Sequence, residues 1–105
     1  MEETKKGWIC CSRDNAYHGN ERVKMVVVDN YEKVKEFIKT NIESIKDAIA
    51  DHINNGNLSI EKEIIEDGYY FLSLKNNNTN IFENDNCYFI LDSFEFSYNI
   101  PFNFG

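Results

Sequence analysis

Residues 29–56, DNYEKVKEFIKTNIESIKDAIADHINNG, hold the one long helical pattern of this sequence. Apolar residues recur along it at steps of three or four, which places them on one side of an α-helix: Val34, Ile38, Ile42, Ile45, Ile49 and Ile53. Asp29, followed three residues later by Glu32, has the form of an N-terminal capping box. Asn54, Asn55 and Gly56 favour the left-handed conformation in which many helices end. The pattern therefore predicts a helix over residues 30–54, about 37 Å long at about 1.5 Å per residue.

Apolar runs on both sides of this helix predict β-strands. Before it, residues 8–11 and 23–28 form two such runs, and residues 1–7 are expected to be a frayed lead-in. After it, similar runs cover residues 58–65, 69–74 and 87–100. The dipeptide Asp67-Gly68 between two of these runs is a strong hairpin signal.

The first strand after the helix is expected to have an acidic outer face. Leu58, Ile60 and Ile64 share one parity along it, whereas Ser59, Glu61 and Glu63 share the other. Two residues on one face of a strand lie about 6.6 Å apart, which is close to the phosphate spacing along a nucleic-acid strand. Glu61 and Glu63 could therefore imitate phosphates.

The last run, residues 87–100, leaves two arrangements open. It is either one long strand or two strands separated by a bulge or bend at Asp92 and Ser93. Asp92 is the one acid among its aromatic residues, so its carboxylate is expected either to be bound within such a bulge or to have a functional role.

The order of these elements is β-β-α-β-β-β, and their short connections favour antiparallel pairing. The sequence predicts an α+β fold with two layers, in which one long helix packs on one face of a mainly antiparallel sheet of four to five strands. A chain of 105 residues is long enough for a single domain, here residues 1–105, with one core.

Composition favours a cytoplasmic protein. No run of eighteen apolar residues occurs, and the charged N-terminus lacks the apolar centre of a signal peptide. The three cysteines form no disulfide pattern, which suits a reducing compartment. The chain has fifteen Asn and twelve Ile but only three Ala, and this usage of AT-rich codons points to a host with a low-GC genome.

Negative charge is concentrated in the second half of the chain. Residues 1–55 hold ten acids and nine bases, for a net charge of −1, whereas residues 56–105 hold eight acids and two bases, for a net charge of −6. Nucleic acids are bound chiefly by Lys and Arg, so direct nucleic-acid binding is not expected. The asymmetry instead indicates a basic partner.

Candidate catalytic and metal-binding residues are few. A metal site could be built from four residues of types that commonly bind metals: Cys10, Cys11, His18 and Cys87. Adjacent cysteines on a strand point to opposite faces, however, so Cys10 and Cys11 cannot easily bind one ion together. His18 and His52 could activate a cysteine nucleophile, although no sequence spacing supports such a pair. The glycine-rich phosphate loop, the nucleophile elbow and the paired zinc-binding histidines are missing from the sequence. We therefore expect a non-enzymatic protein without a cofactor or a metal.

Both faces of the C-terminal strands carry aromatic or aliphatic residues, and a single helix can cover only one face. The other face needs the chain's own ends, a second copy or another protein to cover it. Acidic and aromatic residues of this half are the predicted partner-binding set: Glu61, Glu63, Glu66, Asp67, Tyr69, Tyr70, Glu83, Asp85, Glu95, Phe96 and Tyr98.

These features favour a small acidic inhibitor that blocks a larger, basic or nucleic-acid-binding protein. Anti-defence proteins of phages or mobile elements, including anti-CRISPR proteins that act on nuclease effectors, are similar in size and charge. An immunity protein that neutralises a cognate toxin fits the same description. A homodimeric accessory or structural protein, in which two copies cover each other, is a third hypothesis.

Overall fold

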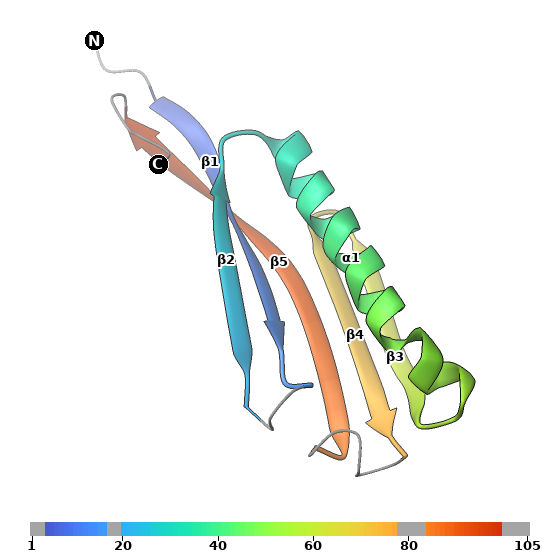
Figure 1. The fold of residues 1–105 in the computed structure, drawn as a ribbon. Helices are drawn as coiled ribbons and strands as arrows, with labels where there is room; N and C mark the ends of the chain where they lie inside the picture. Colours follow the sequence, from blue (N-terminus) through green and yellow to red (C-terminus); the bar gives the residue numbers. More distant parts are fainter. Residues whose placement is uncertain (1–3, 17–19, 78–83, 100–105) are drawn as a thin grey trace.

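The structure, a computed structural model, describes residues 4–16, 20–77 and 84–99. In chain order the elements are β1 (Thr4–Asp14), β2 (Arg22–Val28), α1 (Tyr31–Asn54), β3 (Leu58–Glu66), β4 (Tyr69–Asn76) and β5 (Asn86–Asn99). The strands form one sheet in the order β2-β1-β5-β4-β3, and every neighbouring pair is antiparallel. Helix α1 lies across one face of this sheet, starting beside the end of β2 and running toward β3 (Figure 1). The predicted two-layer α+β fold and its element order are confirmed.

Helix α1 ends at Asn54, as the sequence predicts, but its N-cap residue is Asn30 and not the predicted Asp29. The Asn30 side-chain Oδ1, not a carboxylate of Asp29, accepts a hydrogen bond from the backbone N–H of Lys33 at 3.0 Å. Asp29 instead pairs with the Lys33 ammonium at 2.9 Å, and this ion pair lowers the pKa of the Asp29 carboxyl. At the other end Gly56 adopts a φ of 81°, a conformation that glycine reaches without steric cost.

Strands β1 and β5 form a long ribbon. The pairing runs without a shift from Thr4 opposite Asn99 to Asp14 opposite Phe89. The prediction that residues 1–7 are frayed is therefore wrong for Thr4 to Gly7, which are part of β1. The ribbon also settles the last run as one strand, because Asp92 and Ser93 pair in register and no bulge separates them.

The expected parity of β3 is wrong because a bulge changes it. Leu58 and Ile60 pair with Asn76 and Leu74, but the register then shifts between Ile60 and Lys62. Beyond this point Glu63 and Ile65 continue the helix-facing side, and Ile64 and Glu66 lie on the opposite side. Glu61 and Glu63 therefore do not follow each other along one regular strand face, which removes the geometric basis for phosphate imitation.

The core lies between α1 and the sheet. The helix contributes four buried residues of its apolar stripe: Val34, Ile38, Ile45 and Ile49. The sheet contributes eight buried residues that pack against them: Cys10, Leu58, Tyr70, Leu72, Leu74, Cys87, Phe89 and Leu91. Each strand alternates its side chains, so one set of residues from each strand faces the helix.

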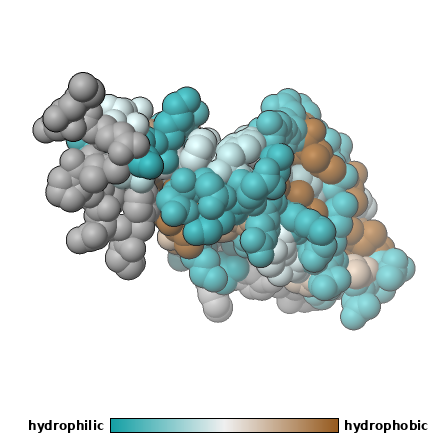
Figure 2. Space-filling view, turned by 90° about the horizontal axis from the view of Figure 1, so that it is seen from above, coloured by the Kyte–Doolittle hydropathy of each residue, from teal (hydrophilic) through white to brown (hydrophobic). Residues whose placement is uncertain are grey.

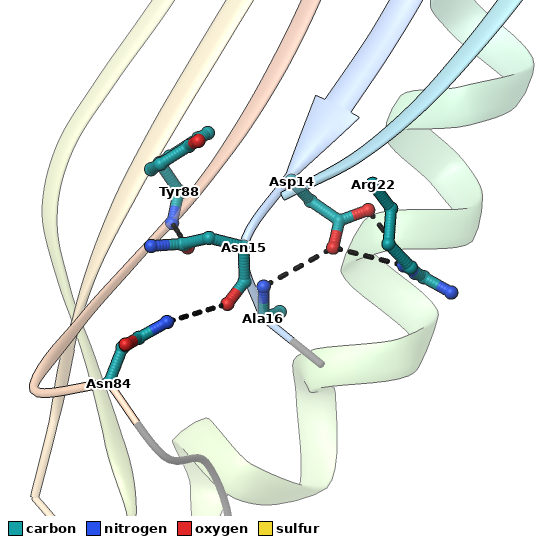
Figure 3. A network of polar contacts seen from close by, with 6 residues as sticks. All are labelled: Asp14, Asn15, Ala16, Arg22, Asn84 and Tyr88. Carbon is teal, nitrogen blue, oxygen red and sulfur yellow. Dashed lines mark hydrogen bonds and ion pairs between the residues drawn. The ribbon is translucent and has the colours of Figure 1, made fainter. Parts of the chain in front are cut away.

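A network of asparagines closes the sheet at one end. The Asn15 side-chain Oδ1 accepts from the Tyr88 N–H at 2.8 Å, and its carbonyl accepts from the Asn84 side chain at 3.0 Å (Figure 3). The Asn76 side chain donates to the Asn84 carbonyl at 3.0 Å. Asp14 accepts from the Ala16 N–H and from the Arg22 guanidinium, at 3.2 Å in each case. Asparagine side chains here bind backbone groups that the strands leave unpaired.

Candidate protein-binding face

The face of the sheet opposite α1, here called the open face, is built by alternation along five paired strands. Residues that share it come into rows through the strand register. One row joins Val27, Ile9 and Phe94, and a second joins Val23, Arg13, Ile90, Phe71 and Ile64. In the part of the chain that the structure describes, no further element packs on this side.

The open face is apolar over much of its area. Phe94 is 57% exposed, and Met25 and Val27 are 66% and 49% exposed, because no layer covers them. Five aromatic residues of β5 and β4 point the same way with partial exposure: Tyr69, Phe71, Tyr88, Phe96 and Tyr98. Phe96 lies over Gly7, where an added Cβ would come within 2.6 Å of the ring, and its ring centroid is 5.9 Å from that of Tyr98. Apolar patches of this kind on a protein surface mark interaction sites.

An ion pair lies within this apolar area. Arg13 Nη2 and Asp92 Oδ2 are 3.2 Å apart, on adjacent strands, and the Asp92 side chain is only 14% exposed. Asp92 Oδ1 is buried and has no hydrogen-bond partner among the described residues. Cys11 lies directly opposite Asp92, and burial, followed by the Asp92 charge, raises the pKa of its thiol. This thiol is therefore protonated and a poor nucleophile at neutral pH.

Acidic residues border the open face at the turn between β3 and β4. Glu66 pairs with Tyr69 on the open face, and Asp67 lies in the turn itself. The Asp67 carboxylate accepts a hydrogen bond from Tyr31 Oη of α1 at 2.7 Å, and this bond raises the pKa of the Tyr31 hydroxyl. At the opposite edge, the hydroxyl of Tyr88 donates to Glu21.

Part of the predicted partner-binding set lies elsewhere. Tyr70 is fully buried in the core, and its hydroxyl donates to Glu63 at 2.6 Å. Glu63 also pairs with Lys46 of the helix at 3.5 Å, so it connects β3 to α1. Glu95 lies on the helix side of the sheet and pairs with Lys6 at 3.2 Å. These three residues do not belong to the open face.

The remaining predicted residues are distributed between the face and its surroundings. Tyr69, Phe96, Tyr98 and Glu66 share the open face, and exposed Glu61 lies at the bulge of β3. Asp85 is exposed just before β5, where its carbonyl accepts from the Asn76 N–H at 2.8 Å. Glu83 lies outside the described residues, as does His18.

Sequence reasoning missed the contribution of the N-terminal strands. Ile9, Val23, Met25 and Val27 extend the open face across β1 and β2. The alternation of Val23, Met25 and Val27 is visible in the run VKMVVV. The side on which they lie is set by pairing with β1, which in turn pairs with β5, more than sixty residues away.

The described residues contain no group of three or more His, Cys, Asp or Glu side chains that could hold a metal ion. Cys10 and Cys87 face the helix and Cys11 faces the open side, and all three are buried, unpaired thiols. Burial raises the pKa of each thiol. No helix within residues 4–16, 20–77 and 84–99 is long and apolar enough to cross a membrane.

A groove of about 400 Å³ lies on the helix side, between α1 and the start of β2. Its lining mixes polar and apolar side chains: Ser12, Asp14, Arg22, Val23, Lys24, Asn41, Ser44, Ile45, Ala48 and Phe89. Arg22 is held there by the carboxylate of Asp14. The groove separates β2 from the helix, and it leaves much of β2 exposed.

Apolar residues also reach the surface between hydrophilic ones when the molecule is viewed from above (Figure 2). The features that distinguish the chain are a broad open face and an edge strand, β2, that is exposed on both sides.

Comparison of the chain with protein-family models, with curated proteins and with solved structures gives no match.

Proposed function

We propose that this protein binds a larger protein through the open face of its sheet and thereby blocks that partner. The observation that carries the proposal is the exposure of Phe94, Met25 and Val27 on one continuous face. Covering such a face with a complementary surface removes apolar area from water, which is the main favourable term in protein association.

The chemistry of the face defines the partner that would fit it. The centre of the open face requires an apolar patch on the partner, against which its tyrosine and phenylalanine side chains can pack closely. At the margin Glu66 and exposed Glu61 favour a partner with Lys or Arg around its apolar patch.

Blocking is the consequence that suits this architecture. The helix-covered side is used for the core, so the open face is the broad surface left for a partner. A rigid sheet that covers a functional surface needs no chemistry of its own. The net charge of −7 further favours partners whose working surface is basic, as in nucleic-acid-binding proteins.

The test compares two exposed apolar residues on opposite sides of the sheet. Phe94 on the open face is 57% exposed, and Ile65 on the helix-facing side of β3 is 64% exposed. The wild-type chain, the Phe94→Ser variant and the Ile65→Ser variant are each used to capture proteins from cells of the source. The proposal requires a protein that is retained by wild type and by Ile65→Ser and lost with Phe94→Ser.

A salt series on the purified complex tests the electrostatic part. The affinity should fall as ionic strength rises, and Glu66→Gln should flatten this dependence. Glu63 and Asp67 are unsuitable for the same test because both carry structural hydrogen bonds. In the capture experiment, a partner retained equally by wild type, Phe94→Ser and Ile65→Ser would refute binding through the open face.

A further inference from the structure

The two edges of the sheet differ in how well they are protected from further pairing. The β3 edge has a bulge between Ile60 and Lys62, and four charged residues surround it: Glu61, Lys62, Glu63 and Glu66. Bulges and charges on an edge strand are the usual protection against pairing with another chain. The β3 edge is therefore protected against pairing with a strand of another chain.

The β2 edge has fewer of these devices, since it has no bulge and its charged residues are Arg22 at its start and Lys24. Its seven residues pair with β1 without any shift, from Arg22 opposite Asp14 to Val28 opposite Trp8. Apolar side chains are exposed on both sides of the strand: Val23 52%, Met25 66%, Val26 44% and Val27 49%. Lys24 is the one charged residue within this apolar segment. Among the described residues, no strand lies beside the outer N–H and C=O groups of β2, and a regular, apolar edge of this kind favours β-augmentation.

We propose that β2 pairs antiparallel with β2 of a second copy, so that two five-stranded sheets become one continuous sheet of ten strands. Figure 1 shows α1 running from the end of β2 toward β3, so the helix leaves the outer edge of β2 uncovered. The pairing does not depend on the open-face partner proposed above.

Symmetry and charge together select the register. A two-fold axis perpendicular to the sheet lies between the two β2 strands, beside one residue that then faces its own copy. An axis at Lys24 would place two ammonium groups opposite each other, which is unfavourable. An axis at Met25 pairs all seven residues, with Val23 opposite Val27, Lys24 opposite Val26 and Arg22 opposite Val28 of the second copy. No like charges face each other within the strand in this register.

The same axis keeps both open faces on one side of the joined sheet. Val23 and Val27 of the two copies then continue the rows that begin at Ile90 and Phe94, and Met25 lies between them. The dimer would therefore present the open face twice, in one plane, and could hold two partner molecules or one partner with two-fold symmetry.

Charge exchange at the two-fold axis tests the pairing. Sedimentation of the wild-type chain over a range of concentrations should show a dimer. Met25→Lys and Met25→Glu should each shift the chain to a monomer, and an equimolar mixture of the two should recover the dimer. Ile65→Lys, at a similarly exposed site on the β3 edge, should leave the dimer unchanged. Wild type that stays monomeric at high concentration, or variants that stay dimeric alone, would overturn the proposal.

Cross-linking tests the register. Cys11 lies opposite Met25 within one chain, so the variants are made in a Cys11→Ala background to prevent an internal disulfide. Met25→Cys should form an intermolecular disulfide on oxidation, because paired residues of antiparallel strands have Cα atoms about 4.5–5.5 Å apart. Val23→Cys should not, because its own copy would lie four residues along the strand. Equal cross-linking of both variants would reject the Met25 axis.

The outcomes separate this proposal from the proposed function. A wild-type chain that stays monomeric but still captures its partner would contradict only the edge pairing. Loss of partner binding in Phe94→Ser with an intact dimer would support both.

Discussion

Arg13 and Asp92 meet on the open face from neighbouring strands, with 3.2 Å between Nη2 and Oδ2. The two residues are seventy-nine positions apart in the chain, so the pair forms only when β1 and β5 have paired in register. The ion pair is diagonal and joins two adjacent rows of the open face, because Arg13 lies opposite Ile90 and Asp92 lies opposite Cys11.

A double-mutant cycle should show strong coupling between these two residues. Arg13→Met or Asp92→Leu alone leaves one poorly solvated charge, and each should lower the free energy of unfolding by about 1–3 kcal/mol. The double variant should lose less than the sum of the two, by about 1 kcal/mol or more. Urea unfolding measures all four chains. The exposed pair Lys35 and Glu32 serves as the control, with an expected coupling below about 0.5 kcal/mol. Simple additivity at Arg13 and Asp92 would contradict the prediction.

Stability should fall at alkaline pH through Tyr70. Burial, and then the hydrogen bond to Glu63, raises the pKa of the Tyr70 hydroxyl well above its ordinary value. The unfolded chain loses this proton near about pH 10, whereas the native chain keeps it, so the unfolded state binds fewer protons. The free energy of unfolding should decline above about pH 10 at up to about 1.4 kcal/mol per pH unit from this residue. Tyr70→Phe should flatten the decline, and an unchanged slope in this variant would rule out the assignment.

Alanine substitutions at two glycines distinguish the cost of backbone strain from the cost of steric overlap. Gly56 and Gly68 both have positive φ, at 81° and 72°. An added Cβ at Gly56 meets nothing within 4 Å, but at Gly68 it would lie 2.8 Å from Ser93 Oγ and 3.0 Å from Tyr31 Oη. Gly56→Ala should therefore cost about 1 kcal/mol of unfolding free energy, and Gly68→Ala at least about 1 kcal/mol more. Thermal and urea unfolding would measure the difference; equal costs would show that the close packing at the turn is absent.

The helix cap provides a fourth stability test. Asn30→Ala removes the acceptor of the Lys33 N–H and should cost about 1 kcal/mol. Asp29→Ala removes an exposed ion pair with Lys33 and the weak hydrogen bond that Asn30 Nδ2 donates to Asp29 at 3.5 Å, so it should cost less than Asn30→Ala. The reverse order in unfolding experiments would favour Asp29 as the capping residue.

Local signals made the helix and the β3–β4 hairpin predictable. The spacing of Val34, Ile38 and Ile45 requires a helix, and Asp67-Gly68 supplies a turn conformation that few other dipeptides reach. The cap was misplaced by one residue because Asp29 and Asn30 are both good N-cap residues, and their sequence does not separate them.

The candidate site was less predictable because it depends on register. A single extra residue at the β3 bulge moved Glu63 from the expected outer face to the helix side. Tyr70 shares a strand with Tyr69, but alternation sends it into the core. Met25 pairs with β1, and the side of the sheet that Arg13 and Met25 share is fixed by the pairing of β1 with distant β5, which no local pattern specifies.

The central claim is that the open face is the binding surface. The most direct test is the dissociation constant of the purified partner complex, measured by calorimetry for wild type, Phe94→Ser and Ile65→Ser. Binding through the open face predicts at least about a tenfold weaker complex for Phe94→Ser, equivalent to about 1.4 kcal/mol, and an unchanged constant for Ile65→Ser. Equal affinities of all three chains, or a loss confined to Ile65→Ser, would contradict it.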